Sequence, residues 1–177
     1  MVLNNYYAYN YYREKQQGYL YSGAVLGYDT GIKAIDGTNV KIGGNVSGGE
    51  SSHAQCREIV GRSMRMYADN SFILSDSEDP VESTIYNLSS ASGISVGSTS
   101  TNFGGGSGKQ TYTATITGTN TGSSAVSIRK IGICKTPYYY SYGTSTGPKF
   151  IMAVCEFDTP YVIEPGSFNI TVEWIME

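Results

Sequence analysis

A histidine and a nearby cysteine are the residues of this chain best suited to nucleophilic or metal chemistry. His53 and Cys56 are three positions apart, so they would share a face of a helix, and such pairs can form a nucleophile or bind a metal. His53 is the only histidine, however, and the other cysteines, Cys134 and Cys155, lie in apolar stretches. We therefore expect a surface histidine beside a buried cysteine, and we predict no catalytic residue, no cofactor and no metal site.

Four carboxylates gather in one short segment of the chain. They are Asp76, Glu78, Asp79 and Glu82. A calcium loop alternates its oxygen ligands and turns at a glycine, whereas Pro80 follows Asp79 here. The segment has two interpretations, a weak calcium site and an exposed acidic loop, and we favour the acidic loop. A polysaccharide hydrolase would need two such carboxylates in a cleft, which no sequence pattern indicates.

The glycine-rich run Gly104–Lys109 resembles a phosphate-binding loop only superficially. Gln110 stands where that loop needs a serine or threonine for magnesium, and the run precedes an expected strand rather than a helix. We predict a flexible loop before a strand that begins at Gln110.

The bulk composition argues against nucleic-acid binding and membrane insertion. The net charge is −3 and the pI is about 5.2, whereas nucleic-acid binding needs a basic face. Arg57, Arg62 and Arg65 form a local basic cluster, but their acidic neighbours favour a solvated or salt-bridged face. No apolar stretch approaches the roughly 20 residues of a membrane span.

The cysteines and the first residues indicate the compartment. Three cysteines without a C-x-x-C spacing are typical of buried thiols in a reducing environment. The residues after Met1 are polar and tyrosine-rich and lack the basic and apolar regions of a signal peptide. We expect synthesis in the cytoplasm without export by the usual route.

The richest group of potential contact residues lies in the first 17 residues. Its tyrosines are Tyr6, Tyr7, Tyr9, Tyr11 and Tyr12. The segment has little aliphatic material to bury, which is typical of a disordered tail. Tyrosine, however, carries a large ring and a hydroxyl at low entropic cost, which suits docking. We favour a docking arm, whose removal should leave a folded domain.

A second tyrosine cluster lies in the segment Pro137–Gly143. It contains Tyr138, Tyr139, Tyr140 and Tyr142. The segment joins two expected core strands, so it should project as a long hairpin loop. The tyrosines either cap the edge of the fold or form a contact patch for another protein or a glycan, and we favour the patch.

The C-terminal half predicts strands by its alternation. Segment 112–117 alternates apolar residues with threonines, and segment 168–176 alternates large apolar residues with polar ones. The pair Pro165-Gly166 predicts the turn before the last strand.

Two further features refine these strands. Ile128 and Ile131 fall in opposite phases, which predicts a β-bulge at Arg129-Lys130. The nearly continuous apolar run Phe150–Phe157 predicts a central strand that is buried on both faces.

Short strands and turns are expected over residues 18–49. Tyr19–Tyr21 and Ala24–Tyr28 have strand composition, whereas Asp29–Gly31 and Asp36-Gly37 have turn composition.

These elements together predict the domain organisation and the fold class. Glycines between residues 43 and 49 indicate a connection, so residues 1–49 form an arm with short strands and residues 50–177 form the main domain. Residues 51–68 are ambiguous between a short helix and a strand. Short strands with glycine and proline turns predict an all-β fold. We expect an antiparallel β-sandwich, of jelly-roll or immunoglobulin-like type, with a tyrosine-rich N-terminal arm.

Four segments occur in a recognisable order between residues 69 and 177. In residues 69–88 an apolar pair leads into small polar residues and a Tyr-x-Leu element. The sequences N-T-G-S-S (120–124), I-R-K-I-G-I (128–133) and V-I-E-P-G (162–166) follow, the last before an alternating strand. This order resembles virion structural proteins of tailed bacteriophages. Lys130 stands where those proteins usually have an acidic residue.

The resemblance implies a non-enzymatic component of the tail, collar, fibre or capsid surface, made in the host cytoplasm and located in the virion. Its expected partners are other virion proteins and copies of itself. An alternative is a receptor-binding or carbohydrate-adhesion module whose tyrosine loop contacts a host-surface glycan. A hydrolase of cell-wall or capsule polysaccharide is a third hypothesis, without support from the residues.

Overall fold

The computed structural model describes residues 1, 3–15, 19–22, 28–43, 70–106, 109–135 and 149–176. Within them lie the helix α1 (Asn4–Lys15) and the strands β1 (Tyr19–Ser22), β2 (Tyr28–Lys33), β3 (Asn39–Gly43), β4 (Asn70–Ser75), β5 (Ile94–Gly106), β6 (Lys109–Asn120), β7 (Val126–Lys135), β8 (Phe150–Ile163) and β9 (Gly166–Met176). The predictions for residues 51–68, including His53 and Cys56, and for the tyrosine loop Pro137–Gly143 lie outside the described residues. So does the expected boundary between residues 49 and 50.

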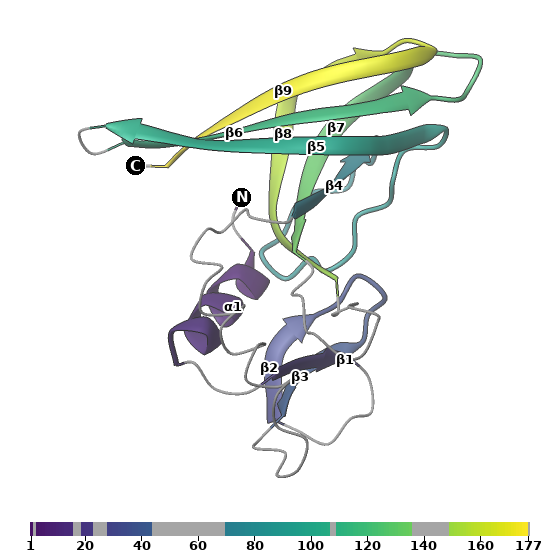
Figure 1. The fold of residues 1–177 in the computed structure, drawn as a ribbon. Coiled ribbons are helices and arrows are strands. Elements are labelled where there is room, and N and C mark those ends of the chain that lie inside the picture. The colour runs from purple at the N-terminus through teal and green to yellow at the C-terminus, as the bar shows by residue number, and fades with distance from the viewer. Residues whose placement is uncertain are drawn as a thin grey trace, which may run out of the picture.

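The strands form antiparallel sheets of three strands each, in the orders β1-β3-β2, β4-β7-β8 and β5-β6-β9. The β4-β7-β8 sheet lies between the other two, and α1 lies beside the β1-β3-β2 sheet (Figure 1). The predicted all-β, antiparallel class is confirmed. The N-terminal segment, expected to be an arm, is the helix α1.

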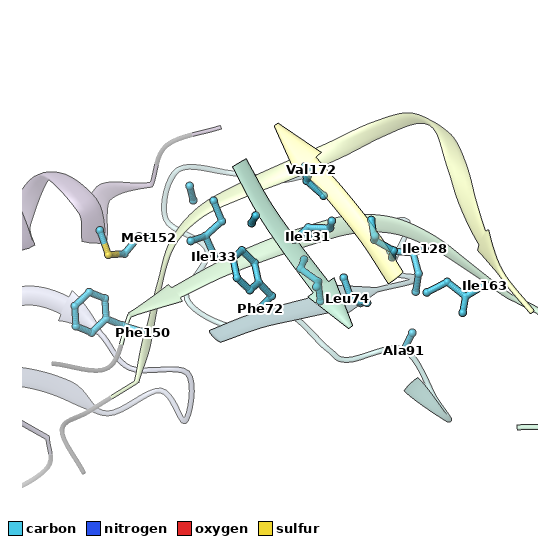
Figure 2. Close-up of a cluster of buried hydrophobic side chains, with 14 of the residues drawn as sticks. Phe72, Leu74, Ala91, Ile128, Ile131, Ile133, Phe150, Met152, Ile163 and Val172 are labelled. Atoms are coloured by element: carbon cyan, nitrogen blue, oxygen red, sulfur yellow. The ribbon is translucent and has the colours of Figure 1, made fainter. Parts of the chain in front are cut away.

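The β4-β7-β8 and β5-β6-β9 sheets meet in one buried cluster. Ile131 and Ile133 of β7 and Ile116 of β6 are 0% exposed and belong to it. Figure 2 shows side chains from β4, β7, β8 and β9 converging there. Full burial of a large apolar side chain contributes about 1.5–3 kcal/mol, so this cluster holds the two layers together.

The alternation predicted for the last strand is confirmed over the side chains described. In β9, Ile170 and Val172 are buried, whereas Asn169 and Thr171 are exposed. In the neighbouring β6, Ala114 is buried as predicted. Because strand side chains point alternately to opposite faces, the apolar set faces the core and the polar set faces outward.

The predicted turns have mixed outcomes. The Asp36-Gly37 turn is confirmed: Gly37 has a φ of +84°, and the Asp36 carboxylate accepts hydrogen bonds from the Thr38 hydroxyl (2.7 Å) and amide (2.9 Å). Both hydrogen bonds lower the pKa of the Asp36 carboxyl, and the bond from the Thr38 hydroxyl has the larger effect. Gly166 has a φ of +108°, as its predicted turn requires. The turn predicted at Asp29–Gly31 is wrong, because these residues lie inside β2 where its register with β3 shifts.

The glycine run is strand rather than loop. Gly104–Gly106 end β5 and pair with Lys109–Thr111 of β6. The predicted flexible loop is therefore wrong for these glycines, because a hairpin needs only a short connection between its strands. The expected strand start at Gln110 is confirmed to within one residue.

The position of the β-bulge predicted at Arg129-Lys130 is confirmed. The register between β7 and β8 shifts between Ile128 and Lys130. Opposite the single residue Arg129, strand β8 has the four residues Phe157–Pro160, so the extra residues lie in β8 rather than in β7 as predicted. Across this irregularity, Ile128 and Ile131 of β7 both belong to the main cluster.

Strand β8 is buried on both faces over its first residues, but its predicted central position is wrong. It lies at the end of its sheet, beside β7. Phe150 and Met152 belong to the main cluster, whereas Ile151 and Val154 belong to a second cluster that includes Leu88 of the β4–β5 connection. The long apolar run therefore reflects burial of both faces of β8 by two hydrophobic clusters, and not a central position of β8 in its sheet.

The N-terminal residues cover the outer edge of this part of β8. The Leu3 amide donates to the Met152 carbonyl (2.9 Å), and the Val154 amide donates to the Met1 carbonyl (2.9 Å). Leu3 is 0% exposed in the second cluster. These bonds satisfy backbone groups that would otherwise be open at a sheet edge.

The connections β6–β7 and β8–β9 both cross between the layers, and Asn120 links them. Its side-chain amide donates to the carbonyls of Ser124 (2.9 Å) and Ile163 (3.1 Å), and its oxygen accepts from the Gly122 amide (2.9 Å). Asn120 is buried, and its side chain is paired on both the nitrogen and the oxygen. The N-T-G-S-S sequence therefore forms a structural corner.

Candidate interaction surfaces

The N-terminal tyrosines differ in where their side chains lie. Tyr9 is 2% exposed, and its ring centroid is 5.6 Å from that of Phe150 in the main cluster. Tyr6 is partly buried, whereas Tyr7 is 63% exposed. The sequence predicts that Tyr9 contacts a neighbouring protein, but its side chain packs in the core of this chain. The reason is that its ring completes the apolar surface between α1 and β8. The backbone of Tyr11 and Tyr12 is helical.

A buried asparagine fixes α1 in place. The Asn5 side-chain amide donates to the carbonyls of Lys33 (2.9 Å) and Ile151 (3.0 Å), and its oxygen accepts from the Lys33 amide (3.0 Å). Asn5 is 5% exposed, and it joins the helix to both β2 and β8. Among the predicted contact residues of this segment, Tyr7 is the one whose side chain is shown to be open to a partner. The contact roles of Tyr6, Tyr11 and Tyr12 stay predictions.

The acidic segment is an exposed loop arranged around a buried lysine. Asp76, Glu78 and Asp79 are exposed, whereas Lys130 is 3% exposed. The Lys130 ammonium donates to the carbonyls of Ser77 (2.6 Å) and Asp79 (2.5 Å). No three His, Cys, Asp or Glu side chains gather in a metal-binding arrangement among the described residues. The cation that the loop binds is the Lys130 ammonium of the protein itself.

Two ion pairs lie at the bulge: one joins β7 to β8, and the other joins β7 to the acidic loop. Lys130 Nζ lies 3.8 Å from Glu156 Oε1, and Arg129 Nη2 lies 2.7 Å from Glu78 Oε1. The second pair is exposed and therefore adds little stability. The sequence alone did not predict that Lys130 or Arg129 contacts the acidic loop. The signal that could have indicated the Lys130 contact is a lysine at a position of the predicted bulge whose side chain points into the protein.

A shallow pocket lies on the β4–β5 connection. Its volume is about 350 Å³, and its lining is Pro80, Glu82, Thr84, Ile85, Tyr86 and Asn87. Tyr86 is 36% exposed, and the Lys33 ammonium lies 4.9 Å from its ring centroid. The lining combines an aromatic ring with a carboxylate, a hydroxyl and an amide, which is a set that can contact a polyhydroxylated ligand.

The outer face of the β5-β6-β9 sheet is polar and almost uncharged. Hydroxyl groups of adjacent strands contact one another on it: Ser98 and Thr117 Oγ atoms are 2.8 Å apart, and those of Thr115 and Thr171 are 3.4 Å apart. Lys109 and Glu173 are the charged residues of these three strands. Depletion of charge distinguishes the centre of a protein interface from the remaining surface.

The Cys134 thiol is fully buried and is not accessible as a nucleophile. Burial raises the pKa of the Cys134 thiol to about 11, against a smaller opposite effect of Lys149. A thiol with so high a pKa is protonated and unreactive at neutral pH. None of the helices described is long and apolar enough to span a bilayer.

Comparisons with known proteins give no relative. No protein-family description, no curated protein and no solved structure matches this chain.

Proposed function

We propose that this protein is a non-enzymatic structural component of a bacteriophage particle, and that it assembles through contacts with other virion proteins and with copies of itself. In this proposal its two packed sheets form a β-sandwich of jelly-roll or immunoglobulin-like type, and it joins the virion after synthesis in the host cytoplasm. The resemblance of residues 69–177 to virion proteins supplies the class of particle.

The nearly uncharged outer face of the β5-β6-β9 sheet is the observation that carries the proposal. Thr171 and Asn169 are exposed on it, and Thr115 is half-buried. A sheet face that is exposed only to solvent would be expected to carry charged residues at alternate strand positions, because the average chain has about 25% charged residues. The chain instead has 15%, and few of these are in this sheet.

The test is whether added charge on this face prevents incorporation into particles. A phage stock carrying Asn169→Lys with Thr171→Lys should yield particles that lack the protein or fail to form. The matched control is Ser123→Lys, because Ser123 is exposed in the β6–β7 connection. Equal incorporation of both variants, measured on gradient-purified particles, would contradict the proposed use of the face. Absence of the unmodified protein from the particles would contradict the virion assignment.

A carbohydrate-adhesion role is the second candidate, and the shallow pocket favours it. Tyr86 offers a ring for sugar stacking, and Glu82, Thr84 and Asn87 offer hydrogen-bonding groups around it. Titration with host-envelope glycans should shift the NMR resonances of these residues. The double variant Tyr86→Ala, Asn87→Ala should lose the shifts, whereas Tyr161→Ala, which removes an exposed tyrosine elsewhere, should keep them. Adsorption that survives the double variant would exclude this pocket.

A further inference from the structure

Among the described strands, β5 lies at one edge of its sheet. It pairs with β6 on one side, and no described strand pairs with its other side. The strand spans Ile94–Gly106, which is 13 residues, and contains neither a charged residue nor a proline. Long exposed edges of this kind are templates for pairing with another chain, and natural proteins usually protect them.

The edge of β8 in the same molecule is protected by the usual means. Its first part is covered by the backbone bonds from Met1 and Leu3. Its second part contains Glu156, Asp158 and Pro160, together with the bulge. Charges, a proline and an irregular register each discourage pairing with another strand. The contrast shows that the bare edge of β5 is not a general feature of this fold.

The second half of β5 has the regular geometry that strand addition requires. The register with β6 shifts between Val96 and Thr99 and then runs without interruption to Gly106, opposite Lys109. Within that stretch Ser100 and Asn102 are exposed on the outer face. This regular segment, Thr99–Gly106, has eight residues and matches the length of an ordinary strand.

We infer that this edge pairs with the β5 edge of a second copy of the chain, in antiparallel orientation, to give a continuous six-stranded sheet. Antiparallel pairing of a strand with its own copy is generated by a two-fold axis, so residues near the axis lie close to their own equivalents. A charged residue near the axis would then lie close to a like charge, and β5 has no charged residue. The other open edge of this sheet, β9, carries Glu173 and lacks this property.

This inference rests on the proposed assembly role, and it names the partner and the edge. The test uses the full chain in analytical ultracentrifugation over a range of concentrations. The unmodified protein should show a reversible monomer–dimer equilibrium. Ser100→Lys with Asn102→Lys should weaken it about tenfold or more, because pairing would place four added lysines on two neighbouring strands. High salt should restore part of the loss.

The control places the same number of charges outside this sheet. Ser123→Lys with Ser124→Lys, both exposed in the β6–β7 connection, should leave the dimer intact. If both double variants lose self-association, the loss does not depend on the β5 edge, and the inference is overturned. If neither loses it, another surface is used, and the inference is likewise overturned. Particle incorporation, measured separately, decides the proposed function whatever the outcome in solution.

Hydrogen exchange of the unmodified protein gives a second measurement that needs no variant. Amides of Ser100–Gly106 should exchange more slowly at high than at low protein concentration, whereas amides of β9 should not change. A monomer at all accessible concentrations, with unchanged β5 exchange, would also overturn the inference.

Discussion

Lys130 shows how one buried side chain organises an entire loop. Its ammonium binds two carbonyl oxygens of the segment that follows β4, and Lys130 itself lies where the register between β7 and β8 shifts. A buried charge is tolerated only when it is paired and hydrogen-bonded, and here both conditions are met. The acidic residues of the loop can therefore remain in solvent while its backbone is held against the sheet.

Replacement of Lys130 by methionine should lower the free energy of unfolding by about 2–3 kcal/mol, because two carbonyl groups lose a charged donor. Chemical denaturation measures the effect. Arg129→Met is the matched control, since it removes only the exposed pair with Glu78 and should cost about 0–1 kcal/mol. Equal losses in the two variants would show that Lys130 does not hold the loop.

The buried Cys134 thiol makes the free energy of unfolding depend on pH in the alkaline range. Its pKa is about 11 when folded, against an ordinary value of 9.0, so its contribution is complete below about pH 9. It is lost as the pH rises toward 11, because the unfolded chain ionises first; the loss approaches about 2–3 kcal/mol. Unfolding measured between pH 8 and about pH 11 should show this loss in the native protein and a smaller one in Cys134→Ala. Identical pH profiles would contradict a buried, protonated thiol.

At the scale of the element, Gly118 permits close contact between β6 and its two neighbours. A Cβ atom at this position would collide with the Ser95 carbonyl and with the Phe168 ring. The Phe168 ring therefore lies across the backbone of β6 where no other residue would fit. Gly118→Ala should lower stability by about 1–3 kcal/mol.

Gly97 provides the control for that substitution. A Cβ atom there would meet the Thr117 carbonyl at 3.4 Å, which is ordinary contact. Gly97→Ala should therefore change the free energy of unfolding by less than about 0.5 kcal/mol. Thermal unfolding of both variants separates the two expectations, and a tolerated Gly118→Ala would contradict the close packing.

The strands that alternate in sequence were predictable because one of their faces is buried and the other is not. This holds for β6 and β9, and the change of phase at Arg129-Lys130 located the bulge. Strand β8 was misplaced within its sheet, since a continuous apolar run reports burial on both faces but not which elements supply the cover. The shallow pocket at Tyr86 was also not predictable, because it depends on how the acidic connection folds back beside Lys33.

Helix α1 was not predictable from local composition. Its tyrosines and asparagines have low helix propensity, so its formation depends on tertiary contacts. Asn5, Leu3 and Tyr9 supply these contacts, and none of them belongs to a periodic apolar pattern. The sequence correctly marked the segment as unusual, but not which tyrosine the core would take.

At the scale of the whole molecule, the N-terminal residues belong to the core that the later strands build. The main cluster includes Tyr9 and Ile32 together with residues of β6, β7 and β9. Removal of the first 15 residues should therefore destabilise the protein, in contrast to the folded remainder expected from sequence.

Two single substitutions distinguish core packing from docking in this segment. Tyr9→Ala should cost about 3 kcal/mol or more in unfolding free energy, because a large buried ring is lost. Tyr7→Ala should change stability by less than about 0.5 kcal/mol. If Tyr7 contacts a neighbour, its replacement should instead reduce incorporation into particles. A large stability loss from Tyr7→Ala, or none from Tyr9→Ala, would contradict the described helix.

The long register between β6 and β9 has a mechanical consequence. It runs without a break from Gln110 opposite Met176 to Asn120 opposite Gly166. A force that pulls these two strands along their length in opposite directions loads all the hydrogen bonds between them at once, whereas a perpendicular force opens them one after another. The protein should thus resist tension along β6 far better than across it, and single-molecule stretching from the two directions would measure the difference.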